Sequence, residues 1–200
     1  MGYHRAGFDV FGVDIKPQPR YPFERIQSDA LEYVAAHGHE FDAIHASPPC
    51  QHYSACKTMH TCQNKEYPDL IAPTRDLLKK SGKPYVIENV KGSPLIGPVK
   101  LTGIMFNLKL HRERWFESSE FFLSPELPGY CGQVVGKNGF VCMAGHGDSG
   151  RGRIPADHRT VAAWKSASGI DWMTQKEMAQ AIPPAYTEYI GKELMKILKR

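Results

Sequence analysis

The sequence predicts an α/β domain, with a mostly parallel sheet covered by helices on both faces. Strand-like apolar runs cover residues 8–15, 41–46 and 85–90, and helix-like segments cover residues 29–36 and 68–80. Strands that alternate with helices along a chain are typical of βαβ units, in which successive strands lie parallel. Ligands of such sheets bind at the carboxyl ends of the strands. We therefore expect the polar residues that close these runs to meet at one edge.

The strand predictions come from β-branched and aromatic residues followed by breakers. Residues 8–15 are rich in Val, Phe and Ile and stop before Pro17. Residues 41–46 are stopped by Pro48 and Pro49 in the same way. Apolar runs of this length that end at prolines favour buried strands over helices.

The helix predictions come from a cap and from spacing. Asp29 stands directly before a helix-forming run, where an aspartate caps the first turn. Apolar residues recur at helical spacing in the second helix, at Leu70, Ile71, Leu77 and Leu78. Helical periodicity returns after residue 174.

The composition indicates an ordinary globular chain. Of its 200 residues 42% are hydrophobic and 23% are charged, and the formal net charge is +4. That charge permits a polyanionic partner without pointing to one. The sequence shows no secretion-type leader and no apolar run of membrane-spanning length, so we expect no membrane association. The five cysteines (50, 56, 62, 131 and 142) include no Cys-x-x-Cys pair, which favours reduced thiols over disulfides.

The chain divides into three predicted segments. Residues 1–122 form the strand–helix core, and residues 174–200 return to it as helices. Residues 123–173 form a loop-rich insertion, because eight of the 18 glycines lie between Gly129 and Gly152.

The candidate nucleophile is Cys50, in the turn Ser47-Pro48-Pro49-Cys50-Gln51 directly after a strand. Two prolines fix the backbone and pre-orient the thiol at the sheet edge. A thiol becomes a strong nucleophile when its pKa falls. On this turn alone, a small buried cysteine explains the pattern as well as a nucleophile does.

A carboxyl group follows at the end of the next predicted strand. Glu88 lies within the apolar run 85–90, where a glutamate is costly without a purpose. Thiolate attack on C6 of a pyrimidine puts negative charge on the ring, and a neighbouring acid at N3 stabilises it. Arg112 and Arg114 then stand close together, a spacing that suits base edges or phosphates.

In order along the chain, these residues resemble the motifs of the DNA cytosine-C5 methyltransferases, especially compact phage and bacterial members: Pro49-Cys50-Gln51 with Ser54, Glu88-Asn89-Val90, and Arg112-Glu113-Arg114. Two further stretches resemble the family's second strand and its final motif, namely Gly12-Val13-Asp14 and Ala181-Ile182-Pro183-Pro184. The resemblance spans about residues 2 to 122 and resumes at about residue 174. It implies a Rossmann-like class I methyltransferase sheet.

The resemblance also implies roles for individual residues. The catalytic residues would be Cys50, Glu88, Asn89, Arg112 and Arg114. S-adenosylmethionine would be bound by Asp14, Ile15, Asp29, Ala30, Pro49, Gln180 and Ile182. Double-stranded DNA would be contacted by Gln51, Ser54, Arg151 and Arg153. No metal site is implied, and the expected location is the cytoplasm of a bacterial or phage-infected cell.

One family feature is absent from the sequence. Family members begin with a strand and a glycine-rich loop that cradles the methionine part of the cofactor, whereas this sequence opens inside the following helix. The strand would lie in the middle of the sheet. Its absence is explained by a truncated or misplaced chain start, by a segment from another chain, or by an inactive methyltransferase-like protein that binds DNA.

Three other interpretations compete with this one. Ser-Pro-Pro is typical of exocyclic-amine DNA methyltransferases, in which no covalent adduct forms. His and Cys residues crowd between His45 and Cys62 as in a zinc module, although the paired spacing of structural zinc sites is lacking. Residues 145–150 match G-x-G-x-x-G, but no apolar helix follows.

Overall fold

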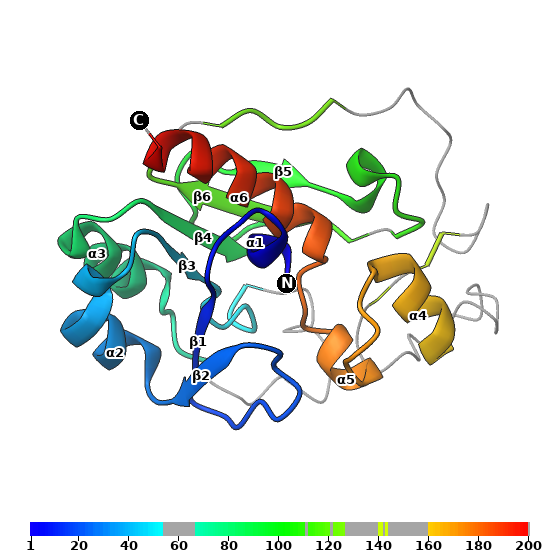
Figure 1. The fold of residues 1–200 in the computed structure, drawn as a ribbon, viewed down its shortest axis with the longest axis horizontal. Coiled ribbons are helices and arrows are strands. Elements are labelled where there is room, and N and C mark those ends of the chain that lie inside the picture. The colour runs from blue at the N-terminus through cyan, green and yellow to red at the C-terminus, as the bar shows by residue number, and fades with distance from the viewer. Residues whose placement is uncertain are drawn as a thin grey trace. The chain divides into compact units, whose positions relative to one another are not determined.

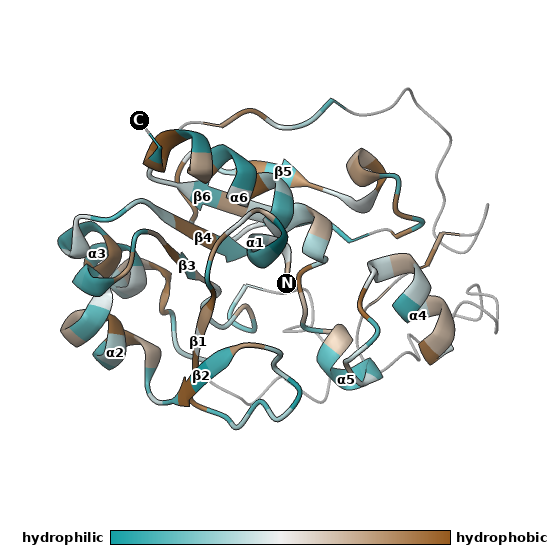
Figure 2. Cartoon of the chain, in the orientation of Figure 1, coloured by the Kyte–Doolittle hydropathy of each residue, from teal (hydrophilic) through white to brown (hydrophobic). Residues whose placement is uncertain are grey.

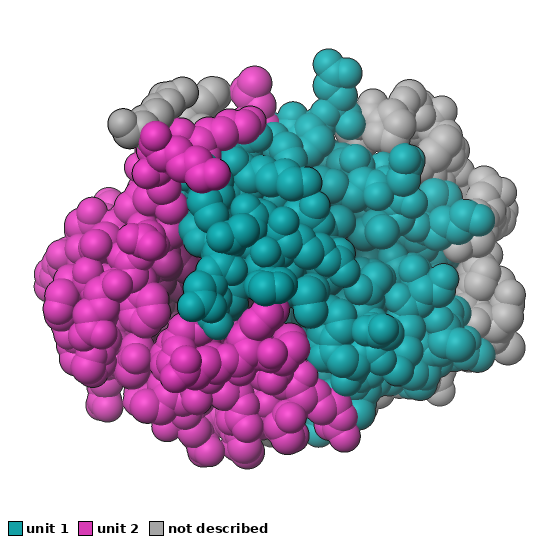
Figure 3. Space-filling view, in the orientation of Figure 1, with its two compact units in different colours: residues 1–10, 101–113, 124–195 teal, residues 11–100, 114–123, 196–200 magenta. Residues whose placement is uncertain are grey.

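The computed structural model describes residues 1–53, 67–110, 112–120, 122–126, 140–141, 143 and 160–199. They fall into two compact units, which are taken separately below (Figure 3). Unit 1 comprises residues 1–10, 101–113 and 124–195, and unit 2 comprises residues 11–100, 114–123 and 196–200. Each unit draws on distant parts of the chain, so neither coincides with the three contiguous segments predicted from the sequence.

Unit 2 is built on a sheet of mixed direction. The strand order is β3-β4-β6-β5, with bounds Ile44–Ala46, Tyr85–Asn89, Arg114–Ser118 and Val99–Leu101 (Figure 1). Strand β4 runs parallel to β3 and antiparallel to β6. The α/β class and two of the predicted strands are thus confirmed. Strand β6 runs antiparallel beside β4, so this sheet is mixed rather than wholly parallel.

A second, two-stranded sheet in unit 2 contains β1 (Phe11–Asp14) and β2 (Glu24–Gln27), which are parallel. Figure 2 shows β2 as mostly hydrophilic, with Ile26 as its one apolar residue. The connection between the strands folds back on β1, because a Cβ added to Gly12 would lie 2.6 Å from the ring of Tyr21. A larger residue at position 12 would have to displace the Tyr21 ring.

The two predicted helices of unit 2 are confirmed, with slightly shifted ends. Helix α2 (Ala30–His37) begins where the Asp29 carboxylate accepts hydrogen bonds from the amides of Leu31 and Glu32. Helix α3 (Ile71–Ser81) ends at Gly82, whose φ of +68° favours glycine. Short 3-10 turns follow at Gly38–Glu40 and, in unit 1, at Gly103–Phe106.

A buried ion pair joins α3 to β6. Arg75 Nε and Nη2 donate to the two carboxylate oxygens of Glu117 at 2.6 and 2.7 Å. The same groups hold the segment after β4, since Arg75 also donates to the carbonyl of Pro94 and Glu117 accepts from the amide of Ile96. Both charged groups therefore have hydrogen-bond partners within the protein, as a buried ion pair requires.

In unit 1, helix α1 (Gly2–Arg5) contacts helix α6 (Pro184–Leu198) with almost no space between them. A Cβ on Gly191 would lie 2.7 Å from the Cβ of Ala6 and 3.0 Å from the ring of Tyr3. The backbones approach this closely only because position 191 carries no side chain. Burial here also raises the pKa of Tyr3 far above its usual range.

The rest of unit 1 packs around the short helices α4 (Val161–Ser168) and α5 (Gln175–Met178). The core consists of Leu110, Val141, Met143, Trp164, Ala167, Ile170 and Met178. Helix α4 lies within residues 123–173, the insertion that the sequence predicts to be loop-rich. Thr160 caps its start, and Gly169 ends it with a φ of +69°. Within the described ranges, no helix has the length and apolar character needed to cross a membrane.

Replacing Gly191 by alanine is expected to lower the free energy of unfolding by about 1–3 kcal/mol, because the added methyl group forces α1 away from α6. Chemical denaturation measures the change, with the exposed Lys196→Ala on the same helix as control. Alanine normally stabilises a helix relative to glycine. A stabilised Gly191→Ala variant would therefore disprove the close approach.

Replacing Arg75 by methionine is expected to destabilise the protein by about 3–5 kcal/mol, because it leaves the Glu117 carboxylate buried without its charge partner. The double variant Arg75→Met, Glu117→Met should recover part of this loss in urea unfolding. Lys192→Met, which breaks the exposed pair with Glu188, should cost about 0–1 kcal/mol. An equal loss of stability for Arg75→Met and Lys192→Met would contradict the buried pairing of Arg75 with Glu117.

Candidate functional site

The register of unit 2 puts a set of functional side chains on one face of the four-stranded sheet. His45 pairs with Val86 across β3 and β4, and Glu88 pairs with Phe116 across β4 and β6. Since side chains alternate along a strand, His45, Glu88, Phe116 and Arg114 share a face. The rings of His45 and Phe116 pack edge to face, with centroids 6.3 Å apart.

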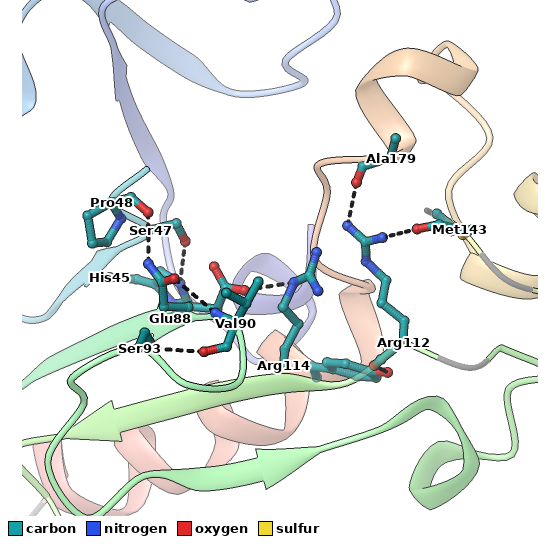
Figure 4. Close-up of polar contacts among 12 residues, drawn as sticks. His45, Ser47, Pro48, Glu88, Val90, Ser93, Arg112, Arg114, Met143 and Ala179 are labelled. Carbon is teal, nitrogen blue, oxygen red and sulfur yellow. Dashed lines mark hydrogen bonds and ion pairs between the residues drawn. The ribbon is translucent and has the colours of Figure 1, made fainter. Parts of the chain in front are cut away.

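Glu88 and Arg114 form an ion pair on this face. Arg114 Nε lies 2.8 Å from Glu88 Oε1, and the two side chains are 15% and 10% exposed (Figure 4). Little water reaches such a pair, so each charge is held in a defined position. Both are residues for which the resemblance predicts a catalytic role.

The turn that carries Cys50 is tied to the end of β4. Asn89 Nδ2 donates to the carbonyl of Pro48 at 3.0 Å, and Asn89 Oδ1 accepts from the amide of Val90 at 2.9 Å. The amide of Tyr53 donates to the carbonyl of Cys50 and closes the turn. The expected meeting of the Cys50 turn with Glu88-Asn89 is therefore present. Cys50 itself is partly buried.

In the sequence, His45 stands out only as a possible ligand of a zinc module. Its Nε2 lies 3.2 Å from the hydroxyl of Ser47, at the start of the Cys50 turn (Figure 4). Burial lowers the pKa of His45 to about 4, so the imidazole is neutral near pH 7. The available sequence signal was a histidine inside an otherwise apolar strand run.

Arg112 is used differently from Arg114. It belongs to unit 1, where it is 5% exposed. Its guanidinium donates to the carbonyls of Met143 and Ala179, and Tyr186 donates its hydroxyl proton to the carbonyl of Arg112 (Figure 4). The sequence predicts a base or phosphate contact for this side chain, whereas the structure shows it joining backbone segments of unit 1.

The ends of β1 and β2 present the predicted nucleoside-binding residues. The Asp14 carboxylate accepts from the amide of Lys16 at 2.7 Å and from Gln18 Nε2 at 2.9 Å. Ser28 donates its amide to the carbonyl of Asp14, which brings the two strand ends together. Ile15 follows with 65% of its surface exposed.

These residues fit the nucleoside part of S-adenosylmethionine. The carboxylate of Asp14 suits ribose hydroxyls, the exposed apolar side chain of Ile15 suits a purine face, and Asp29 offers a second carboxylate before the exposed Ala30. Asp29 already caps α2, but a carboxylate can accept several hydrogen bonds. The fit extends to the nucleoside alone, because nothing in this set suits the methionine part.

The other predicted residues lie apart from these groups or outside the description. Pro49 and Gln51 are exposed on the Cys50 turn. Gln180 is exposed and Ile182 is partly buried, both in unit 1 after α5. Three predicted DNA contacts lie outside the described residues, namely Ser54, Arg151 and Arg153. Among the residues that are described, no group of three potential ligands could hold a metal ion.

The two sheets of unit 2 bear on the additional strand that the resemblance predicts. Among the described strands, β1 pairs only with β2, and β3 pairs only with β4. The resemblance predicts a strand in the middle of one continuous sheet. The structure has two separate sheets instead, with the predicted nucleoside residues on one and the Cys50 turn on the other.

No protein-family model matches the chain, and a search of curated proteins finds no match.

Acidification is expected to destabilise the protein through His45. Because its folded-state pKa is lowered to about 4 from 6.5, the unfolded chain binds the extra proton first, and stability is lost as the pH falls from about 6.5 towards 4. Urea unfolding across this range should show a smaller acid-induced loss for His45→Gln than for the original protein. The exposed His39→Gln is the control and should follow the original protein. An identical pH dependence for His45→Gln would contradict the buried neutral imidazole.

Proposed function

We propose that this chain is a DNA cytosine-C5 methyltransferase, with Cys50 as the nucleophile and double-stranded DNA as the substrate. One observation carries the proposal: Asn89 ties the Pro48–Cys50 turn to the end of the strand that carries the Glu88–Arg114 ion pair. A thiol, a carboxyl group and a guanidinium thus belong to one sheet edge of unit 2. A thiol supplies the nucleophile for covalent activation of a pyrimidine, and the carboxyl group, held by the guanidinium, stabilises the charge on the ring.

The chemistry begins with the ring, because cytosine C5 is a poor nucleophile. The thiolate of Cys50 forms a bond to C6, and the electrons of the C5–C6 double bond move to C5. Glu88 acts in its protonated form: its hydroxyl donates a hydrogen bond to N3 and its other oxygen accepts one from the exocyclic amine, which stabilises the charge that develops on the ring. After C5 takes the methyl group, water removes the C5 proton, the double bond re-forms and Cys50 leaves as thiolate.

Arg114 supports this step by holding Glu88. Its Nε fixes one carboxylate oxygen at 2.8 Å, so the carboxyl plane is defined before a base arrives. A preorganised charged group costs no reorganisation during the reaction. Arg112 is committed to backbone carbonyls in unit 1, so its proposed contribution is to hold that unit together.

S-adenosylmethionine, when bound, supplies the methyl group as an electrophile at a sulfonium. The residues proposed to hold its nucleoside are Asp14, Ile15 and Asp29, which follow β1 and β2. By resemblance the remaining cofactor contacts are assigned to Ala30, Pro49, Gln180 and Ile182.

The target base must leave the duplex, because the face of a stacked cytosine is closed to a thiol. The resemblance assigns DNA contacts to Gln51, Ser54, Arg151 and Arg153. A net charge of +4 is compatible with a phosphate backbone.

The base chemistry can be tested without the cofactor. Once Cys50 has added to C6, C5 exchanges its proton with solvent, so DNA made with 5-tritiated cytosine should release tritium into water. Cys50→Ala is expected to abolish the release, and Glu88→Gln to slow it by about 10²–10⁴-fold, the contribution of a positioned acid. Lys79→Gln, on the exposed side of α3, is the control.

Three outcomes would overturn the proposal. Tritium release that survives Cys50→Ala would exclude the covalent route. Methyl transfer to an exocyclic nitrogen, again independent of Cys50, would favour the amine-methylating class. A chain that binds DNA but exchanges no proton would be a methyltransferase-like binding protein.

A further inference from the structure

His45 lies under the Cys50 turn but takes no part in the reaction proposed above. It occupies the centre of β3 and shares a sheet face with Glu88, which its pairing with Val86 defines. Its ring packs edge to face against Phe116, the residue of β6 that pairs with Glu88. The imidazole is therefore held by the same strands that hold the carboxyl group.

The turn between His45 and Cys50 has little conformational freedom. Pro48 and Pro49 fix φ near −65°, and a residue that precedes a proline is restricted to extended conformations. The backbone from Ser47 to Pro49 therefore has few accessible conformations. Contacts that hold Ser47 and the Pro48 carbonyl limit the positions open to Cys50.

Both fixing points are present. His45 Nε2 and the hydroxyl of Ser47 are 3.2 Å apart, and Asn89 Nδ2 donates to the carbonyl of Pro48 at 3.0 Å. One contact comes from β3 and the other from the end of β4. The two contacts thus hold the turn in place relative to both β3 and β4.

We propose that His45 is a positioning residue, which sets the location of the Cys50 thiol relative to Glu88 through its hydrogen bond to Ser47. The catalytic consequence rests on the proposed methyltransferase function, whereas the positioning of the thiol does not. A neutral imidazole suits the task, because it and a hydroxyl can each donate or accept. A histidine that served only to fill space beside Phe116 would not depend on a hydrogen bond to Ser47.

The test is a double-mutant cycle of His45→Leu and Ser47→Ala. Cys50 is alkylated with iodoacetamide, and the modified site is located by mass spectrometry of the Cys50 peptide. Each single variant should raise the alkylation rate about fivefold, the change expected when one hydrogen bond that holds a turn is lost. The double variant should match either single variant, because both remove the same contact.

Catalysis provides the second readout. Each variant should lower kcat for tritium release about tenfold with KM for DNA unchanged, because a small misplacement of a reacting group slows the reaction without weakening binding. His45→Gln, which keeps a donor and an acceptor, should recover most of the rate. His39→Gln is the matched control and should leave both readouts unchanged.

The outcomes separate this inference from the function itself. Additive effects in the cycle, no effect of Ser47→Ala, or a His45→Gln variant as impaired as His45→Leu would each overturn the positioning role. Ser47 is exposed, so Ser47→Ala tests the contact even where His45→Leu fails to fold. If the original protein releases no tritium, the proposed function fails, and the alkylation cycle still decides the role of His45.

Discussion

Strand β4 (Tyr85–Asn89) is paired on both edges, and every contact of the Cys50 site depends on that pairing. All five of its residues are buried, with β3 parallel on one side and β6 antiparallel on the other. A shift of one residue in either register would move Glu88 to the opposite face. Because two neighbours and two faces fix the same register, such a shift would disrupt the core and the site together. The geometry of the site thus follows from the packing of a single strand.

The two faces of this sheet use charge in different ways. On one face Glu88 is paired with Arg114, at an edge where a substrate base is proposed to bind. On the other face Glu117 is paired with Arg75 and also accepts from the backbone, so both of its oxygens are satisfied within the protein. A carboxylate in a sheet interior is costly unless it is paired. The second pair is fully committed to structure, which leaves the first as the one suited to chemistry.

The sequence predicted what depends on neighbouring residues. The cap at Asp29, the strand at 85–90 and the proline-bounded Cys50 turn each have a signal within a few positions. It did not predict that Arg112 would bind carbonyls 31 and 67 residues away, nor that β6 would return antiparallel to β4. Long-range partners leave no local pattern. The positioning role proposed for His45 was not predicted for a similar reason, because it depends on contacts with Ser47 and Phe116 rather than on its place in an apolar run.

The proposed reaction has two requirements, and the residues proposed for each of them lie in separate parts of unit 2. The groups for ring activation lie at the edge of the four-stranded sheet, whereas the groups for the nucleoside follow β1 and β2, which are held together by their own pairing and by the Ser28–Asp14 hydrogen bond. Among the described residues, β1 and β3 belong to separate sheets and do not pair with each other. Base activation and cofactor binding therefore do not depend on the same hydrogen bonds. A change at Asp14 should leave proton exchange at C5 intact. A change at Asn89 should leave nucleoside binding intact. Base activation and nucleoside binding can therefore be lost independently of each other.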